Sequence, residues 1–167
     1  MDPHAEGAPL NPAPPPPGAA PALHRVFYVS RCRASTTELD VRRLFDSSLR
    51  NNRERAITGV LVHTGGHFAQ VIEGPAPAVL STMAVIEADT RHEAVARLLQ
   101  GRLHRRQFNR WSVRWQAAPG ADDLLAAVLQ EPVVPPARAH RLLRTLFVEP
   151  PGAGAPDQAS FNGARNS

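Results

Sequence analysis

Two runs of strand-forming residues meet at Gly65-Gly66, and this junction constrains the fold more than any other feature of the sequence. Residues 56–64 precede the two glycines and residues 67–74 follow them, and both runs are rich in apolar side chains. Strand-like runs that are joined through Gly-Gly are typical of a β-hairpin. The sequence therefore predicts an antiparallel pair of strands near the middle of the chain.

The second of these strands carries an amide within an apolar stripe. Alternation places Phe68, Gln70 and Ile72 on one face of the strand. A buried Gln has two donors and an acceptor to satisfy, and each one left without a partner costs about 1 to 3 kcal/mol. Gln70 therefore either bonds a neighbouring protein group and sets the strand register, or it contacts a ligand. The strand alone favours the first interpretation.

A helix is predicted on each side of the hairpin. Ser35-Thr36-Thr37-Glu38 has the spacing of a capping box, so the first helix is expected from about Thr36 to Arg50, with Asn51 and Asn52 at its C-terminal end. The second helix is expected to begin at Pro75 and to end near residues 89–92. The buried stripes predicted for the two helices consist of Val41, Leu44, Phe45, Ser48 and Leu49, and of Val79, Leu80, Met83 and Ile86.

Three further strands and two further helices complete the predicted fold. The strands are expected at 25–31, within 95–100 and at 112–116, and the helices at 121–130 and 136–148. The order strand, helix, strand, strand, helix, strand, followed by an added fifth strand, is that of an α+β, ferredoxin-like βαββαβ sandwich with two helices on one sheet face. Because residues 25–31 are apolar on both faces, we expect the two C-terminal helices to cover the other face.

Composition narrows the class of protein. All 19 basic residues are Arg and the net charge is +4. A general bias toward Arg explains this, so it is weak evidence for a nucleic-acid partner. The single cysteine, Cys32, excludes an internal disulfide and fits a reducing compartment. No apolar run reaches membrane-spanning length and the N-terminus lacks a signal sequence, so we expect a cytoplasmic protein.

Two histidines flank the predicted hairpin turn. His63 and His67 lie on either side of it, and the sequence brings no third metal ligand close to them. Structural zinc sites use four protein ligands and catalytic ones three. We therefore expect both histidines to face solvent and assign no metal site.

Three polar residues are predicted to converge. Tyr28, the only tyrosine, lies in the middle of the first strand, Gln70 in the middle of the third, and Asn52 at the end of the first helix. In the ferredoxin-like order the first and third strands are central neighbours, so Tyr28 and Gln70 are expected within hydrogen-bond reach. A phenol and two carboxamides between two helices suit a planar heterocycle that forms hydrogen bonds. A satisfied Tyr–Gln pair in the core explains the same residues, and both interpretations stay open at this point.

Six motifs follow one another between about Arg25 and Ala117: Tyr28-Val29-Ser30-Arg31, Asn51-Asn52, Ile57-Thr58-Gly59-Val60-Leu61, Phe68-Ala69-Gln70-Val71-Ile72-Glu73-Gly74, Asp89-Thr90-Arg91-His92 and Trp111-Ser112-Val113. Together they resemble the successive signatures of the BLUF family, blue-light sensors that use FAD, in its short single-domain type. Each motif alone is common, but all six occur in order and without large gaps.

The resemblance implies a cofactor and the residues that contact it. FAD would be bound non-covalently, with its ring between the two helices and against the sheet. Asn52 would bond the pyrimidine edge of the ring, and Arg91 and His92 would lie near the ring or its ribityl-phosphate side. The cofactor contacts implied in this way are Tyr28, Ser30, Asn52, Ile57, Gln70, Arg91 and His92.

The resemblance also implies a mechanism. Light would drive an electron and then a proton from Tyr28 to the flavin by way of Gln70, and the hydrogen bonds of Gln70 would be changed afterwards. Family members carry out no net chemical conversion, so no enzymatic activity is expected. The changed hydrogen bonds would be relayed to a protein partner, which the sequence does not identify.

One position departs from the family pattern. The resemblance assigns signal relay to Trp111 and Val113, but members of the family often carry Met where this chain has Val113. Val is shorter than Met and stiff at its first torsion, so it cannot follow a moving Gln side chain as Met can. We therefore expect the photochemistry at Tyr28 and Gln70 to survive, and the route of output and the dark-recovery rate to differ.

The chain is expected to divide into four segments. These are a disordered Pro/Ala-rich leader at 1–22, the BLUF flavin-binding domain at 23–117, a helical extension packed on the sheet at 118–148, and a flexible tail at 149–167. No effector domain follows residue 148, so a protein partner is expected, and the sheet face or the C-terminal helices could form a homo-oligomer. Neither a membrane nor a nucleic acid is expected as a partner.

Two other functions are compatible with a ferredoxin-like fold. A flavin-binding or acylphosphatase-like enzyme would need a nucleophile and a base, and neither Cys32 nor Ser30 has a placed His partner in the sequence. An RNA-binding module would need exposed aromatic residues on the central strands, whereas Phe27 and Phe68 are expected in the core. Both rivals are therefore weaker than a light sensor.

Overall fold

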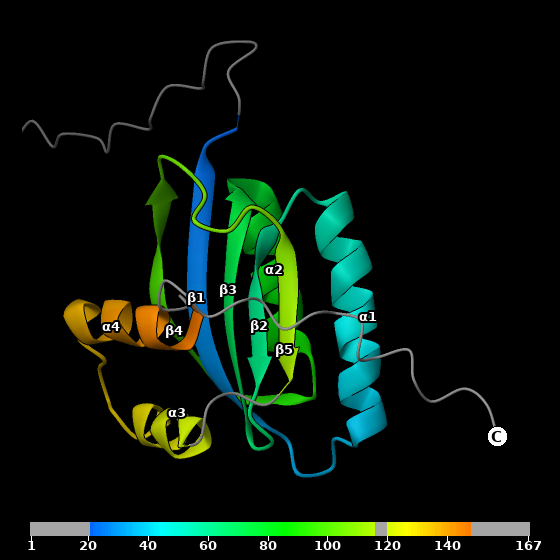
Figure 1. Cartoon of the computed structure of the whole chain (residues 1–167), viewed down its shortest axis with the longest axis vertical. Helices are drawn as coiled ribbons and strands as arrows, with labels where there is room; N and C mark the ends of the chain where they lie inside the picture. The colour runs from blue at the N-terminus through cyan, green and yellow to red at the C-terminus, as the bar shows by residue number, and fades with distance from the viewer. Residues whose placement is uncertain (1–20, 116–119, 148–167) are drawn as a thin grey trace, which may run out of the picture.

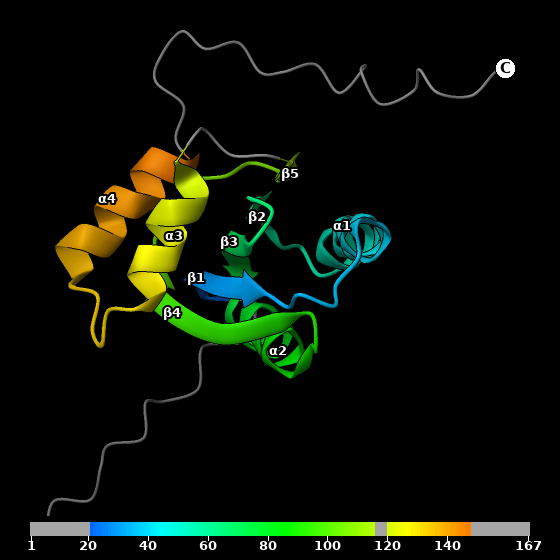
Figure 2. The same cartoon turned by 90° about the horizontal axis from the view of Figure 1, so that it is seen from below.

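The computed structural model describes residues 21–115 and 120–147, which form one mixed sheet covered by helices on both faces (Figure 1). Seen along the strands, α1 and α2 lie on one side of the sheet, and α3 and α4 lie on the other (Figure 2). The elements are β1 (Leu23–Cys32), α1 (Glu38–Glu54), β2 (Thr58–His63), β3 (His67–Pro75), α2 (Ala76–Ala88), β4 (His92–Leu103), β5 (Trp111–Trp115), α3 (Ala121–Leu129) and α4 (Pro136–Phe147).

The strand order confirms the predicted ferredoxin-like arrangement. The sheet runs β4-β1-β3-β2-β5, so β1 and β3 are the central neighbours. They pair antiparallel, and β2 and β3 form the hairpin predicted from Gly65-Gly66. The added strand β5 pairs parallel to β2 at one edge of the sheet. The middle of β3 therefore lies at the centre of the sheet.

The two faces of the central strands belong to two different cores. Phe27 and Val29 pack with α3 and α4, and the ring of Phe27 lies 5.5 Å from that of Phe147, edge to face. Val26 and Tyr28 point the other way and belong to a second buried cluster, which also contains Val79 and Met83 of α2. The C-terminal helices thus bury the second apolar face of β1, as its sequence predicted.

Helix α1 begins later and ends later than predicted. Its N-cap is Thr37, whose side chain and that of Asp40 form the capping box, instead of the predicted box that ends at Glu38. The preceding residues are used in a turn, since the amide of Thr36 donates to the carbonyl of Arg33 at 2.9 Å. At the other end the helix continues to Glu54, so Asn52 lies inside the last turn and is not a cap.

The predicted helical stripes were wrong at one position each. Leu49 of α1 is 52% exposed and Leu80 of α2 is 42% exposed, whereas Val79 and Met83 are fully buried. Both leucines are exposed although they share the helical spacing of the buried residues, so periodicity alone could not distinguish them from core positions. Leu49 borders a cavity that is described below.

The edge strands and C-terminal helices differ from the predictions mainly in length. Strand β4 begins at His92, before the predicted 95–100. It therefore includes the last residue of the Asp89-Thr90-Arg91-His92 motif. Strand β5 begins at Trp111 and α3 ends at Leu129, each one residue earlier than predicted. Apart from residues 21 and 22, the predicted leader at 1–22 lies outside the described residues, as does the predicted tail at 149–167.

Candidate functional site

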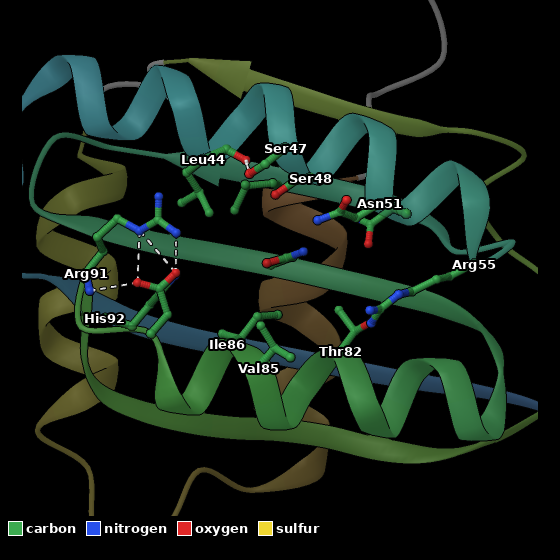
Figure 3. Close-up of a pocket in the computed structure, with 14 residues that line it drawn as sticks. Leu44, Ser47, Ser48, Asn51, Arg55, Thr82, Val85, Ile86, Arg91 and His92 are labelled. Carbon is green, nitrogen blue, oxygen red and sulfur yellow. Dashed lines mark hydrogen bonds and ion pairs between the residues drawn. The ribbon is translucent and has the colours of Figure 1, made fainter.

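A pocket lies between α1 and α2, above the middle of β3 (Figure 3). Its volume is about 150 Å³. Helix α1 and the residue that follows it form one wall, α2 forms the other, and β2, β3 and the start of β4 close it. The lining residues are Leu44, Ser47, Ser48, Asn51, Asn52, Arg55, Leu61, Gln70, Thr82, Val85, Ile86, Asp89, Arg91 and His92.

Two carboxamides of this pocket belong to buried residues and have hydrogen-bonding groups without a partner. Gln70 is 4% exposed and Asn52 is 3% exposed. The Oη–H of Tyr28 donates to Oε1 of Gln70. Within residues 21–115 and 120–147, Nε2 of Gln70 and the side-chain amide of Asn52 have no hydrogen-bond partner. These free donors and acceptors are what a planar heterocycle with carbonyl and N–H groups along its edge requires.

Tyr28 lies behind Gln70, as seen from the pocket. The two residues are directly opposite in the antiparallel β1–β3 pair, and Tyr28 is fully buried. Burial raises the pKa of Tyr28, and the nearby charge of Asp89 adds to this effect. The phenol therefore keeps its proton and donates it to the carbonyl end of Gln70, which leaves the amino end of Gln70 for the pocket.

His92 connects the pocket to the buried hydroxyl of Ser30. Its Nδ1 lies 2.8 Å from Oγ of Ser30, and its ring packs at 4.6 Å from the ring of Phe68. Burial lowers the pKa of His92 to about 4, an effect that outweighs the attraction of Asp89. The imidazole is therefore neutral near pH 7. The expectation that Ser30 has no His partner was wrong, because the two residues are 62 positions apart and only the β1–β4 pairing brings them together.

An ion pair closes one end of the pocket. Nε of Arg91 donates to Oδ1 of Asp89 at 2.9 Å, and its Nη2 donates to Oδ2. Burial raises the pKa of Asp89, but the hydrogen bonds from Arg91 outweigh it and hold that pKa below its ordinary value. At the other end, Nη1 of Arg55 donates to Oγ1 of Thr82 at 3.3 Å, which links the end of α1 to α2 (Figure 3).

The structure brings together some of the residues singled out in the sequence and separates others. Asn52, Gln70, Arg91 and His92 all line the pocket. Tyr28 and Ser30 stand behind Gln70 and His92, each joined to its partner by a hydrogen bond. Ile57 is 2% exposed and packs in the same apolar cluster as Tyr28, but it lines a different cavity. The position of Ile57 therefore gives no support for a contact between Ile57 and a ligand of the pocket.

Several lining residues were missed by sequence reasoning. Ser47 and Ser48 are polar residues on the side of α1 that faces the pocket. Ser48 was included in the buried stripe predicted for this helix, but its hydroxyl was not recognised as part of a binding site. Arg55 and Thr82 come from separate helices, so no local pattern relates them. Asp89 belongs to one of the six motifs, but the sequence did not show that its carboxylate holds the guanidinium of Arg91.

A row of paired residues crosses the sheet from the Tyr28–Gln70 pair to the edge. Gln70 is paired with Leu61 of β2, and Leu61 is paired with Val113 of β5. Val113 is therefore two strands away from Gln70, with Leu61 between them. Trp111, at the start of β5, packs against both the cluster of Tyr28 and the cluster of Leu61.

The segment before β5 is tied to β3 by a buried carboxylate that the sequence analysis did not single out. Glu73 is fully buried and accepts from Nε of Arg25 at 2.8 Å. It also accepts from the backbone amides of Gln107 and Phe108 at 2.8 and 3.1 Å. Glu73 lies three residues after Gln70 on the same strand, so it joins the strand of the pocket to the segment that leads to Trp111.

The two histidines of the hairpin are buried and do not face solvent as predicted. His63 is 6% exposed and His67 is 7% exposed. The ring of His63 packs at 4.8 Å from that of Phe68, and Nδ1 of His67 lies 2.9 Å from Oδ1 of Asp122 in α3. Helix α3 thus meets His67, while the ring of Phe45 in α1 lies 6.5 Å from that of His63. The sequence pattern around the turn could not show either contact. In the part of the chain that the structure describes, no group of three His, Cys, Asp or Glu residues could hold a metal ion.

No helix among the described residues is both long and apolar enough to cross a membrane.

The motifs of the chain match one family model. That model, described as sensors of blue-light using FAD and abbreviated BLUF, matches residues 23–114. The match covers more than half of the 167 residues and includes every residue that lines the pocket.

Curated relatives share this segment within much longer proteins. The photoactivated adenylate cyclase subunit beta of Euglena gracilis is 29% identical over 104 residues, which are 62% of this chain and 12% of the relative. The blue light- and temperature-regulated antirepressor BluF of Escherichia coli K12 is 28% identical over 88 residues, 53% of this chain and 22% of the relative. The chain thus matches only a small part of each relative.

Solved structures of similar length share the fold. The dark-state structure of BlrB, a BLUF protein, is 29% identical with a TM-score of 0.61, and the match covers 75% of this chain and 95% of BlrB. The photo-activated state of BlsA has a TM-score of 0.63 over 77% of this chain and 96% of BlsA. At 21% identity, BlsA is evidence for the fold alone.

Proposed function

Since the chain belongs to the BLUF family, whose members sense blue light with FAD, we propose that Tyr28 and Gln70 form the photoactive pair of this flavin-binding sensor. The observation that carries the proposal is the state of Gln70. Its Oε1 is engaged by Tyr28, while its Nε2 has no hydrogen-bond partner in the described residues and the side chain lines the pocket. One amide thus stands between a phenol and the place that a ligand would occupy.

The lining residues fit a flavin. The side chains of Asn52 and Gln70 present unpaired amide groups to the pocket, which match the carbonyl and N–H groups along the edge of a flavin ring. The unpaired amide groups of Asn52 and Gln70 both lie in this pocket. We therefore propose that the pocket receives the ring system of FAD.

Four residues would hold the flavin in this proposal. Asn52 would bond the edge of the ring, and Gln70 would donate to it through Nε2. The Arg91 guanidinium, held by its ion pair with Asp89, offers N–H donors at one end of the pocket. His92, neutral and hydrogen-bonded to Ser30, fills the wall beside Phe68 and keeps water from the Tyr28–Gln70 pair.

A bound flavin that is excited by blue light would supply a strong oxidant, and Tyr28 would be its electron donor. The role of the protein is to position the donor and its proton. The Oη proton of Tyr28 is already directed at Oε1 of Gln70, so its transfer requires no movement of the backbone. Because one end of an amide donates and the other accepts, a rotated or tautomerised Gln70 presents the opposite groups to Tyr28 and to the pocket. That reversal is the proposed signal.

We propose that the output is an interaction with a protein partner and not an enzymatic reaction. The cyclase named among the relatives is matched over 12% of its length, so its activity gives no reason to expect catalysis here. The Ser30–His92 pair has the residue types of a nucleophile and base, but Ser30 is fully buried and does not line the pocket. A substrate would not reach its hydroxyl. The partially exposed free Cys32 fits our further proposal of a cytoplasmic location.

The organisation of the chain is part of the proposal. We propose that residues 23–117 are the sensor domain and that 118–148 are a helical extension which receives its signal, with a leader at 1–22 and a tail at 149–167. The support is the packing of α3 and α4 on the sheet face opposite the pocket, where they share a core with Val71 and Ala69 of β3. These two residues are the neighbours of Gln70 in β3. A change in the position of Gln70 would therefore be passed directly to residues that contact the core of α3 and α4.

A visible absorption spectrum tests the proposed function. Purified full-length protein is loaded with FAD and measured in the dark, after blue light, and during return to the dark. The expected result is a yellow protein whose flavin band shifts reversibly to longer wavelength. A protein that binds FAD without such a shift would contradict the sensor proposal, and one that remains colourless after incubation with FAD would contradict the pocket assignment as well.

A further inference from the structure

A second and larger cavity lies at the C-terminal end of α1, beside the beginnings of β2 and β5. Its volume is about 520 Å³. These three ends of elements come together at one edge of the sheet (Figure 1). We call it the arginine cavity; it is lined by Leu49, Arg53, Ala56, Ile57, Thr58, Arg106, Asn109, Arg110 and Trp111.

The arginine cavity carries three positive charges and no acidic side chain in its lining. Arg106 is held by neutral acceptors, since its guanidinium donates to Oγ1 of Thr58 and to the carbonyls of Glu73 and Ala56 at 2.7 to 2.8 Å. Arg53 and Arg110 form no ion pair with any residue in the described ranges. Three like charges in a concave setting attract an anionic group more strongly than the same charges on a flat surface.

The nearest buried carboxylate does not offset these charges. Glu73 is paired with Arg25 at 2.5 Å and accepts from two backbone amides. Only its backbone carbonyl meets Arg106. The carboxylate is therefore already neutralised, and the charges of the cavity are available to a ligand.

Apolar side chains line the same cavity. Ile57 is 2% exposed and Leu49 is 52% exposed, so the cavity has a buried floor and an exposed apolar rim. Trp111 stands beside them, and its Nε1 is buried without a hydrogen-bond partner in the described residues. A ligand that suits this cavity has negative charges next to an apolar group, and a carbonyl that reaches the indole would satisfy a donor that is now unpaired.

We propose that the arginine cavity binds an acidic peptide segment of a partner protein. Its carboxylates would meet Arg53 and Arg110, and an apolar side chain would lie against Leu49 and Trp111. Arg and Trp are the residue types most enriched at the energetic centres of protein interfaces. A nucleic-acid strand would need a basic groove that follows several phosphates and exposed aromatic faces. Here the charge is gathered at one concave end, and the only ring is half-buried against the sheet.

The position of Trp111 connects this cavity to the proposed switch. Trp111 packs against the cluster that contains Tyr28 and against the cluster that contains Leu61. A change in the hydrogen bonds of Gln70 would alter the packing of both clusters and with it the contact that Trp111 offers to the peptide. By linkage, the bound peptide would change the stability of the light state by the same factor. This light dependence rests on the proposed function, whereas binding in the dark does not.

Binding in the dark is tested with a labelled peptide by fluorescence anisotropy. The probe is Glu-Glu-Leu-Phe-Glu-Glu with blocked ends, added to FAD-loaded full-length protein, and its control is the same peptide with Lys in place of Glu. We expect saturable binding of the acidic peptide alone. The double variant Arg53→Glu and Arg110→Glu should weaken it by at least about tenfold. Arg102→Glu serves as the matched control, because Arg102 is an exposed arginine of β4, at the opposite edge of the sheet.

A second measurement places the peptide in the cavity. The indole N–H signal of Trp111, assigned by its loss in Trp111→Phe, should shift in a two-dimensional ¹⁵N spectrum when the acidic peptide is added. No saturable binding, an unmoved indole signal, or an equal loss of affinity in Arg102→Glu would each overturn the docking site. Tighter and Arg110-dependent binding of a twelve-residue oligothymidylate would overturn it in favour of a nucleic acid.

The two proposals fail in different ways. If the dark affinity depends on Arg53 and Arg110 but is unchanged by blue light in a protein with a normal photocycle, the coupling through Trp111 is wrong and the docking site stands. If the flavin shows no photocycle at all, the proposed function is wrong, and the dark measurement still decides the docking site.

Discussion

Tyr28 and Gln70 face each other across the two central strands of the sheet, and the phenol donates its proton to only one end of the amide. The other end lines the pocket between α1 and α2. This arrangement makes Gln70 the side chain that is hydrogen-bonded to the buried tyrosine and also lines the place of the ligand. Four of the five predictions below concern this pair or the residues around it.

Removing either member of the pair should abolish the photocycle and retain the flavin. Tyr28→Phe removes the electron and proton donor, and Gln70→Leu removes the group that changes its hydrogen bonds, but Asn52 and Arg91 still line the pocket. Both variants should therefore purify with FAD and show no reversible red shift in visible absorption. Tyr28→Phe also leaves Oε1 of Gln70 unpaired, which should lower the free energy of unfolding by about 1 to 3 kcal/mol. A normal photocycle in either variant would refute these roles.

Asn52→Ala should weaken the binding of FAD by about 5- to 30-fold, the equivalent of one hydrogen bond to a buried amide. The measurement is titration of FAD-free protein by flavin fluorescence. Asn51→Ala is the matched control, because Asn51 also borders the pocket but is exposed to water. An effect of Asn51→Ala as large as that of Asn52→Ala would contradict the assignment of Asn52 to the ring.

The burial of His92 predicts a loss of stability in mild acid. Its pKa is lowered from 6.5 to about 4 by burial, so between these values the unfolded chain binds a proton that the folded protein does not. The contribution is present above pH 6.5 and is lost as the pH falls toward 4, by about 1 to 3 kcal/mol. Urea unfolding at pH 7 and at pH 4.5 should show a larger drop for the natural protein than for His92→Gln. Equal drops would show that other groups, such as Asp89, account for the acid sensitivity.

Val113→Met should slow dark recovery and leave the affinity for FAD unchanged. Val113 is separated from Gln70 by Leu61 in the paired row, and the longer, flexible Met side chain can reach further along that row than Val. A contact worth about 1 kcal/mol in the light state would slow recovery roughly fivefold. Ser112→Ala, at the neighbouring position of β5, is the control. An unchanged recovery rate in Val113→Met would mean that this position takes no part in the relay.

Gly59→Ala should destabilise the fold far more than Gly65→Ala. Both glycines have positive φ, but a Cβ at Gly59 would lie 1.9 Å from the carbonyl oxygen of Val71, whereas a Cβ at Gly65 would meet nothing within 4 Å. Backbone strain alone should cost Gly65→Ala about 1 to 2 kcal/mol. The added clash should bring Gly59→Ala to about 3 kcal/mol or more. Urea unfolding of the two variants measures the difference, and similar values would contradict the close approach of β2 and β3 at Gly59.

Local patterns predicted the elements well and their ends less well. The hairpin at Gly65-Gly66 and the two-sided burial of β1 follow from short-range alternation, which a strand must obey wherever it lies. The start of α1 was predicted too early because several consecutive hydroxyl residues can cap a helix. Thr37 was selected by a turn that uses Thr36 and by the reach of Asp40.

The candidate site depended on both levels. The sequence drew attention to Tyr28, Gln70 and Asn52 because a strand or helix that buries polar groups needs partners for them. It could not show that Ile57 lines a different cavity from Gln70, nor that Ser30 and His92 form a hydrogen bond. Those relationships depend on side-chain direction and on the packing of distant elements.

The sequence by itself determined the strands, the helices, the ferredoxin-like order and the identity of the family, because periodicity and motif order are properties of neighbouring residues. The tertiary structure decided which polar groups meet. It places Glu73 against the segment before β5, gathers three arginines in one cavity, and leaves Nε2 of Gln70 without a partner in the described residues. Hydrogen bonds and charges act over a few ångströms, so their partners are set only when the sheet brings remote parts of the chain together.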